Sequence, residues 1–555
     1  MMEDAKEKEK KSVKQIYISI LALTLMNVTI IAGIGNDVQQ AFYGLSSVTY
    51  FAIGAICFFI PTALVAAELA SGWSNRGGIF RWVGEGLGKG WALTCLLILW
   101  FQTMINFGMG MPSYAATIMF YTPMYDKAVQ FAQHPQHEVL IMTGFIILYW
   151  VLTFVATKGV KAFANVAKYG VLIGTFIPLA LMIILTIVWL CEGHQPAIPM
   201  TPKGLIPKWN GMSTLALAAG VFFSYTGIDM NAAHIKQLKH PEKDFTKAMF
   251  ISMILVFLIF VVGTVIIAMV VPENQINVIY TLNTVFRTLG ATIGIPWLYM
   301  VLVWAGLCNV LASVITNMAG PSFMLGQAGG SGFLPHWFQE KNKHEMPAHL
   351  MYTQIAGMTI IAYLVKLLPN VEGFVIMLTQ TITVLYLFYY ILMFTTFLKL
   401  RYDQPNRPRA FKVPGGKFGA WFVAGLGLLS SIFGIILAIY PPAQVKAEVG
   451  SPVVYISVIL ILVAVILGIC FVMYQLSKHH NWVDPTNKFA PFTWEIEGLK
   501  KPGKVSSNVP TDIMSKDQNP MGMPIKRPYS PDAQVSTKVV KAAEDNKLTS
   551  SDADN

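Results

Sequence analysis

The chain has 555 residues, of which 54% are hydrophobic and only 12% are charged, and its mean hydropathy is +0.54. Soluble domains carry about 25% charged residues, so this composition excludes a soluble enzyme or a soluble binding module. The net charge of +11 does not indicate nucleic acid binding, because the basic residues lie between apolar runs and form no basic helix or aromatic-basic module.

Apolar segments recur along the chain, and each is long enough to cross a bilayer core as a helix, which takes about 20 residues. Barrel strands are excluded because polar and apolar residues do not alternate within the segments. The sequence therefore predicts an all-α polytopic membrane protein with about 12 transmembrane helices. Spans 1 to 12 are expected at 16–40, 46–70, 91–120, 138–157, 163–191, 213–234, 246–271, 293–318, 349–368, 371–399, 418–440 and 452–476.

Basic residues indicate how these spans are oriented. The loops after spans 2, 4, 6, 8 and 10 hold most of the lysines and arginines, as does the N-terminal segment 1–15. Basic residues in short loops are retained in the cytoplasm. Both termini are therefore expected to be cytoplasmic, on either side of a transmembrane domain at 16–477 that contacts the lipid bilayer.

The polar, proline-containing segment 478–555 is expected to form a cytoplasmic, largely disordered tail, because it has too few apolar residues to bury a core. Its first part contains the aromatic residues Trp482, Phe489, Phe492 and Trp494. Two alternatives stay open for this part: it docks against the cytoplasmic face of the transmembrane domain, or it is a plain solvated tail.

No cofactor and no metal ion are expected. No metal-ligand cluster, nucleophile elbow or phosphate-binding loop is recognised in the sequence. The cysteines lie in or beside apolar runs without CxxC spacing and are expected to be inert packing residues: Cys57, Cys95, Cys191, Cys308 and Cys470. The sequence leaves the oligomeric state open.

Two spans carry residues that disfavour a helix near their middle. Span 1 contains Ala32-Gly33-Ile34-Gly35-Asn36-Asp37, and span 6 contains Ser224-Tyr225-Thr226-Gly227-Ile228-Asp229-Met230-Asn231. Each glycine destabilises a helix interior by about 1 kcal/mol. Interrupted helices at matching positions of two halves point to a substrate site at the bilayer midplane, where free amides bind a carboxylate and free carbonyls bind an ammonium group. An amino acid offers both groups; the alternative is that the glycines allow close helix packing while Asp37 and Asp229 cap half-helices.

A set of short motifs accompanies the two interruptions. They are Phe59-Ile60-Pro61, Ala67-Glu68-Leu69-Ala70, Gly77-Gly78-Ile79-Phe80-Arg81-Trp82-Val83, Ser224-Tyr225-Thr226-Gly227, His240-Pro241-Glu242-Lys243-Asp244, Ala319-Gly320-Pro321-Ser322 and Phe411-Lys412-Val413-Pro414-Gly415-Gly416-Lys417. Taken together, the chain resembles the amino acid/polyamine/organocation (APC) superfamily, and within it the glutamate/γ-aminobutyrate antiporter branch. The resemblance covers spans 1 to 12.

The resemblance implies a LeuT-type fold of two inverted five-helix repeats, at 16–191 and 213–399, followed by two peripheral helices at 418–476. It also implies an amino acid antiporter that works by alternating access in the bacterial inner membrane. Two alternatives stay open: a proton-coupled amino acid importer, and a transporter-like amino acid sensor. In relatives of this branch the C-terminal tail can plug the cytoplasmic mouth, but the tail of this chain is not recognisably similar.

The expected substrate-binding residues are Gly33, Ile34, Gly35, Ser224, Tyr225, Thr226, Gly227 and Trp304. Thr379, Thr381 and Thr383 of span 10 are weaker candidates, because a threonine inside a span more often bonds its own backbone.

Coupling or gating is expected of Lys168, Asp229 and Glu68. By the resemblance, the ammonium of Lys168 takes the place of a sodium ion, and the alternative is a lysine that snorkels to the surface. Asp229 either holds a substrate amine or a proton, or caps the interruption. Glu68 is expected to pair with Arg76 or Arg81.

The chain departs from the branch in span 8, where Ser313 and uncharged neighbours such as Asn309 replace an expected acidic residue. The segment after span 6, His234-Ile235-Lys236-Gln237, also lacks an acidic residue that family members often carry there. The first departure bears on which amino acid is bound, and the second bears on gating.

Overall fold

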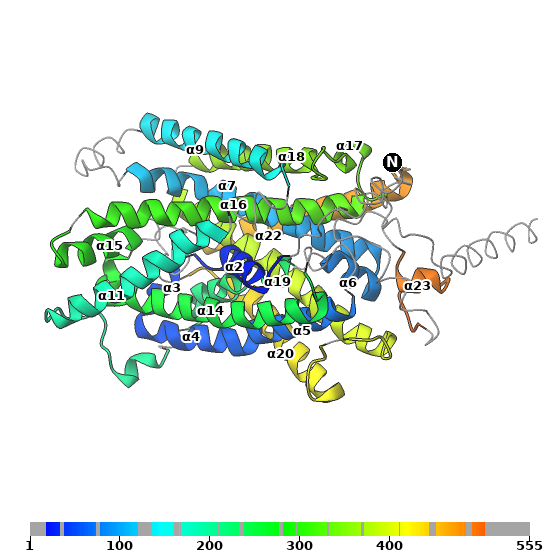
Figure 1. The fold of residues 1–555 in the computed structure, drawn as a ribbon, viewed down its shortest axis with the longest axis horizontal. Coiled ribbons are helices and arrows are strands. Elements are labelled where there is room, and N and C mark those ends of the chain that lie inside the picture. The colour runs from blue at the N-terminus through cyan, green and yellow to red at the C-terminus, as the bar shows by residue number, and fades with distance from the viewer. Residues whose placement is uncertain are drawn as a thin grey trace, which may run out of the picture.

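The computed structural model places a helical bundle whose long helices run in a common direction (Figure 1). No strand forms among the residues that it describes. Those residues are 18–33, 38–73, 78–119, 135–159, 166, 168–207, 211–231, 238–276, 281–295, 297–329, 332–367, 371–409, 411–442, 451–480, 482–483 and 491–505.

Ten helices in the described part are long and apolar enough to cross a membrane. Two of them contain a π-helical turn. In the first, α4 (Ser47–Gly54) continues through η3 (Ala55–Phe59) into α5 (Ile60–Gly72). In the second, the helix that begins at residue 168 continues through η4 (Leu172–Phe176) into α11 (Ile177–Cys191). The others are α7 (Lys89–Met119), α9 (Pro135–Ala156), α14 (Pro241–Val270), α16 (Leu298–Gly329), α18 (Ala348–Lys366), α19 (Val371–Asp403), α20 (Gly416–Ile439) and α22 (Pro452–His479).

These helices match ten of the expected spans, and the all-α polytopic fold is confirmed. The two spans that remain, 1 and 6, consist of shorter helical pieces, so the total of twelve spans stays a prediction. The division into two inverted repeats and two peripheral helices likewise stays a prediction. An amphipathic helix, α15 (Thr281–Thr292), precedes α16 at the end of the molecule opposite α6 (Figure 1).

Span 1 is interrupted after α2 (Ile20–Ile31), where Ala32 turns to an extended backbone with φ −108° and ψ 117°. The helical path resumes in the short α3 (Val38–Ala41). Gly33 is half-buried, whereas Ile34, Gly35, Asn36 and Asp37 lie outside the described residues. The predicted interruption of span 1 is therefore confirmed where it begins, at Ala32.

Span 6 is interrupted after α13 (Ala219–Ser224), which follows α12 (Met212–Leu215) and the 3₁₀ turn η6 (Ala216–Ala218). Residues 225–229 form turns, and Gly227 has a φ of +98°, in the left-handed region that side chains other than glycine rarely adopt. The interruption of span 6 is therefore confirmed. It depends on this glycine.

The described part of the C-terminal tail packs on α6 (Ile79–Gly86), the helix that follows span 2 (Figure 1). In the short α23 (Thr493–Ile496), the backbone N–H and the hydroxyl of Thr493 donate to the Glu85 carboxylate at 3.0 and 2.9 Å. The indole of Trp494 is buried and donates to the Gly84 carbonyl at 3.0 Å. The docked alternative for the tail is confirmed for residues 491–505, and residues 506–555 lie outside the described part.

Docking of the tail needs a glycine on α6. A Cβ at Gly84 would lie 2.2 Å from the ring of Phe492, so the close approach of the two segments excludes a larger residue at this position. Further along, the backbone N–H of Val505 donates to the Asp403 carbonyl at 3.1 Å, and Lys399 donates to the Pro502 carbonyl at 3.0 Å. The tail therefore also contacts the C-terminal end of α19.

We expect Trp494→Ala to release this segment from α6. Truncating a buried tryptophan removes about 3–5 kcal/mol of packing. Amide hydrogen exchange across residues 491–505, followed by mass spectrometry, should accelerate by at least about tenfold, since 1.4 kcal/mol corresponds to a factor of ten. The matched control is Ile496→Ala, because Ile496 lies on the same helix and is exposed. Equal exchange in the two variants would contradict the docking described here.

Candidate functional site

The interruption of span 6 is fixed to α19 by tyrosine hydroxyls. Asp229 is buried, and its carboxylate accepts hydrogen bonds from Tyr389 and from Tyr390, the second at 2.6 Å. The hydroxyl of Tyr390 also accepts the backbone N–H of Gly227 at 2.8 Å. A single side chain of α19 thus satisfies both an amide released by the interruption and the carboxylate that follows it.

Gly227 is the point where spans 1, 6 and 10 meet. A Cβ there would lie 3.0 Å from Ile30 of α2 and 3.5 Å from the hydroxyl of Tyr386 of α19. That hydroxyl is buried and has no hydrogen-bond partner in the described part of the molecule. A buried hydroxyl without a partner is unfavourable by about 1–3 kcal/mol, so it is available to a polar group of a ligand.

Tyr225 holds the end of α13 against span 2. Its hydroxyl donates to the Phe51 carbonyl at 3.1 Å, and its ring stacks on Phe59 with centroids 4.5 Å apart. The hydroxyls of Ser224 and Thr226 bond carbonyls of their own helix, those of Gly220 and Phe223. In this conformation, the three side chains stabilise the interrupted helix itself.

Two other predicted site residues, Trp304 and Lys168, are exposed, unlike this buried group. Trp304 of α16 is 53% exposed. Lys168 is also exposed, and its Nζ lies 5.4 Å from the ring centroid of Tyr169. This placement of Lys168 favours the snorkelling alternative over a buried ammonium that replaces sodium.

Glu68 is buried. The predicted pairing of Glu68 with Arg81 is wrong. Glu68 pairs with Arg401 and with Arg409, the second at 3.0 Å, and accepts the backbone N–H of Val413 at 2.7 Å. Arg81 instead pairs with Glu85 at 2.7 Å. Arg76, the other expected partner, lies outside the described residues. Glu68 therefore ties span 2 to the loop that follows α19.

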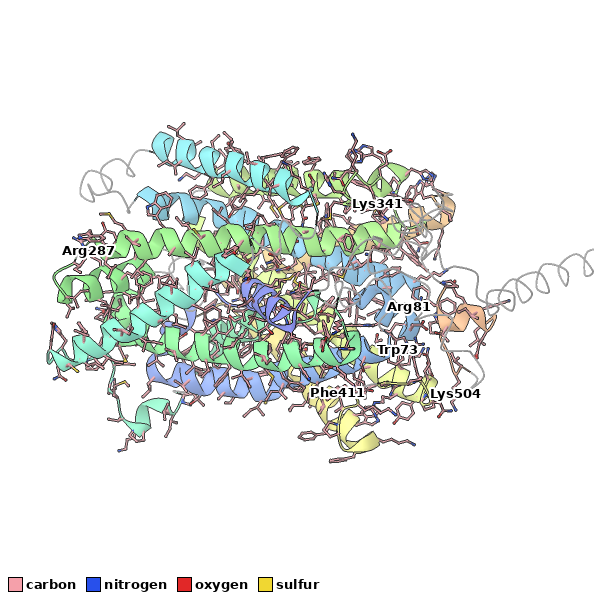
Figure 2. All side chains as sticks on the ribbon, in the orientation of Figure 1. Trp73, Arg81, Arg287, Lys341, Phe411 and Lys504 are labelled. Carbon is pink, nitrogen blue, oxygen red and sulfur yellow. The ribbon has the colours of Figure 1, made fainter. Side chains whose placement is uncertain are left out.

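A second buried carboxylate, Glu85, lies at the same end of the molecule, where Figure 2 shows Trp73, Arg81 and Lys504. It accepts a hydrogen bond from Gln404 at 3.1 Å, and Arg407 donates to Gln404 and to Thr493. Burial lowers the pKa of Arg407 to about 10, and the Glu85 carboxylate opposes that shift. The guanidinium of Arg407 therefore stays charged at neutral pH.

The threonines of span 10 bond their own helix. The hydroxyl of Thr379 donates to the Val375 carbonyl, that of Thr381 to Met377 and that of Thr383 to Thr379. This outcome favours the structural alternative for all three. Among the described residues, no group of three or more His, Cys, Asp or Glu side chains could hold a metal ion.

Sequence reasoning missed the tyrosines of α19 and a buried amide of α2. The three tyrosines are Tyr386, Tyr389 and Tyr390. The second and third follow the first by three and four residues, which places all three near one face of a helix. They lie within a long apolar run, where tyrosine does not stand out as polar. Asn27 is likewise the only strongly polar residue within residues 25–28 of α2, and it is fully buried. A polar side chain at the centre of an apolar span is the signal that identifies both.

Comparison with known proteins agrees with this arrangement. The family model described as amino acid permease matches residues 18–491. An uncharacterised transporter of Legionella pneumophila is 29% identical over 438 residues, covering 78% of this chain and 91% of the relative. A glutamate/gamma-aminobutyrate antiporter of Lactococcus lactis is 28% identical over 456 residues, covering 80% of this chain and 88% of the relative.

A more distant relative, a probable agmatine/putrescine antiporter of Lactococcus lactis, is 23% identical over 447 residues and covers 80% of this chain and 90% of the relative. The named relatives are transporters and not enzymes, in agreement with the membrane-spanning helices of this chain. The family match extends from before α2 to the docked tail, which is nearly the whole described structure. The chain is a multi-pass membrane protein that belongs to the amino acid permease family.

Proposed function

We propose that this protein is an amino acid antiporter of the glutamate/γ-aminobutyrate type that works by alternating access in the bacterial inner membrane, with both termini cytoplasmic. The names of two relatives support antiport, since they are antiporters of glutamate and γ-aminobutyrate or of agmatine and putrescine. The observation that carries the proposal is the junction at Gly227, where two interrupted spans meet an unpartnered tyrosine hydroxyl of α19.

The proposed substrate site lies between the ends of α2 and α13 and includes Gly33 of span 1 and residues 224–227 of span 6. Ile34 and Gly35, the other substrate-binding residues expected in span 1, lie outside the described residues. Both helices end at the interruption, and the carbonyl end of a helix carries partial negative charge that favours an ammonium group. Tyr386 extends this site on the side of α19. Asp229 already accepts two tyrosine hydrogen bonds, which supports its role as a structural cap of the interruption.

Exchange is tested by uptake of radiolabelled glutamate into proteoliposomes that hold the purified protein. We expect uptake into vesicles preloaded with glutamate or γ-aminobutyrate and little uptake into empty vesicles. The reason is that the binding site of an antiporter returns to the outer face of the membrane only when it carries a counter-substrate. Uptake into empty vesicles driven by a pH gradient would instead establish the proton-coupled importer. Binding of amino acids without any uptake would establish the sensor.

Gly227→Leu should abolish exchange while the protein remains in the membrane. The left-handed backbone disfavours any side chain there, and the new side chain would also meet Ile30 and Tyr386. The matched control is Gly468→Leu in α22, since a Cβ at Gly468 meets nothing within 4 Å. If the Gly227 variant exchanged substrate as fast as the control, the substrate site could not lie at this junction.

Tyr386→Phe and Tyr390→Phe should have opposite effects on binding and stability. Tyr386→Phe removes a buried hydroxyl without an internal bond, so the melting temperature in detergent should stay the same or rise. The half-saturation concentration for substrate should rise about 2- to 10-fold, the equivalent of one hydrogen bond of roughly 0.5–1.5 kcal/mol. Tyr390→Phe removes the bonds to Asp229 and Gly227 and should lower the melting temperature. An unchanged half-saturation concentration in the Tyr386 variant would exclude its hydroxyl from the site.

A further inference from the structure

The segment that joins α19 to α20 carries positive charge and no negative charge. Between Asp403 and Glu448 the sequence contains no aspartate or glutamate, but it contains five basic residues: Arg407, Arg409, Lys412, Lys417 and Lys446. The two arginines bond groups of the buried network described above. Lys412 and Lys417 are exposed, and neither forms an ion pair within the described part of the chain. Their charges are therefore available to a partner from outside the protein.

The backbone on both sides of Lys412 is fixed to span 2. The carbonyl of Phe411 accepts the hydroxyl of Ser71 at 3.0 Å, and the backbone N–H of Val413 donates to the buried carboxylate of Glu68 at 2.7 Å. The side chain of Lys412 thus leaves the protein from a fixed point. Whatever holds this lysine also holds the loop that satisfies Glu68.

A third lysine comes from α14. The ring of Phe411 packs on that of Phe250 with centroids 6.0 Å apart, which attaches the loop to the first turns of α14. Lys247 lies one turn before Phe250 and is exposed. Exposed apolar residues follow Lys247 at helical spacing: Ile251, Ile254 and Leu258. Lys247 therefore ends the outer apolar face of α14.

The first turn of α20 ends an apolar face in the same way. Phe418 is 80% exposed, and exposed apolar residues share its side of the helix at Phe422, Leu429 and Ile436. The helix has 24 residues, whereas about 20 are enough to cross the bilayer core. Lys417 and Phe418, at its beginning, are therefore expected at the boundary between the bilayer core and water.

Aromatic side chains accompany the lysines at this boundary. The indole of Trp421 donates to the hydroxyl of Tyr402 at 2.6 Å, and both side chains are exposed. Tryptophan and tyrosine are enriched where a membrane protein meets the lipid headgroups. α5 packs against both α14 and α20 at this corner of the bundle (Figure 1), where Figure 2 shows Phe411. We name the surface formed by Lys247, Lys412, Lys417, Phe418 and Trp421 the boundary patch.

We propose that the boundary patch binds an anionic phospholipid. The phosphate lies among the three lysines, and the acyl chains lie along the outer apolar faces of α14 and α20. A bound headgroup holds Lys412 and so stabilises the loop whose Val413 amide bonds Glu68. This binding goes beyond the proposed transport activity and does not depend on it.

Exposed lysines at one end of a membrane protein also follow from topology alone, because basic loops are retained on one side. The loop before α18 has that character: Lys341 and Lys343 are interspersed with Glu340 and Glu345, and Lys341 pairs with Glu345 at 4.0 Å. The boundary patch differs because its connecting segment contains no acidic residue and its lysines end two apolar helix faces. Charge complementarity therefore favours an anionic lipid as the occupant.

The direct test is native mass spectrometry of the purified full-length protein, titrated with phosphatidylglycerol or with zwitterionic phosphatidylcholine. We expect phosphatidylglycerol to bind at the lower concentration. Lys412→Gln with Lys417→Gln should weaken its binding about 25-fold, or about fivefold for each lysine, the equivalent of about 1 kcal/mol per basic residue near an anionic lipid. Equal binding of the two lipids, or equal binding by the variant and the unsubstituted protein, would overturn the proposal.

The matched control is Lys158→Gln with Lys343→Gln. It removes the same charge from two exposed lysines that are close together, since Asn342 bonds the carbonyl of Thr157 at 2.7 Å. They lie at the same end of the molecule, beside Lys341 in Figure 2. This control should bind phosphatidylglycerol within about twofold of the unsubstituted protein. A loss as large as that of the Lys412 and Lys417 variant would show a general effect of surface charge and would contradict a site at the boundary patch.

A second measurement distinguishes a lipid from a free phosphate. Phosphatidylglycerol in the micelles should slow amide hydrogen exchange across residues 411–416 of the unsubstituted protein, because the headgroup holds this loop. Inorganic phosphate and glycerophosphoglycerol, which is the headgroup without acyl chains, should not slow it at the same concentration. Equal protection by the soluble compounds would exclude a lipid as the occupant. Protection by phosphatidylglycerol that persists in the Lys412 and Lys417 variant would place the lipid elsewhere and overturn the proposal.

Discussion

The structure depends on how an interrupted helix is satisfied inside a membrane. Lipid offers no hydrogen-bond partner, so each backbone amide released from a helix must find one within the protein. At span 6 that partner is Tyr390, whose hydroxyl accepts the Gly227 amide and donates to Asp229. The interruption can therefore be held open as a polar site only where α19 brings its tyrosines to it, which explains why spans 6 and 10 are packed together.

A different arrangement stabilises the end of the bundle where α6 and the docked tail lie. Two buried carboxylates, Glu68 and Glu85, are surrounded by arginines that come from α6 and from the end of α19 and the loop that follows it. The docked tail completes this network, because Thr493 supplies hydrogen bonds to Glu85 that the helices themselves do not provide. This end of the bundle thus has ionic and directional contacts, whereas the contact of α2 with α16 includes an apolar cluster.

The spans and the two interruptions could be predicted from local sequence, because span length and glycine content are local properties. The partners of the interruption could not. Tyr389 and Tyr390 read as apolar core residues of span 10 until packing shows which face of α19 meets span 6. Glu68 was predicted to pair with arginines close to it in the sequence. Its partners, Arg401 and Arg409, instead lie 333 and 341 residues further along the chain. Trp304 and Lys168 were predicted as site residues, yet both side chains are exposed in the structure, and a single sequence does not determine burial.

The candidate site depends on the junction at Gly227, where α2, the span 6 interruption and Tyr386 meet. The most direct measurement is a cryo-electron microscopy structure of the protein with its amino acid substrate bound. We expect density for the substrate between Gly33 and Gly227, with a polar atom within hydrogen-bond distance of the Tyr386 hydroxyl. Substrate density elsewhere in the bundle, with this hydroxyl still unpartnered, would contradict it.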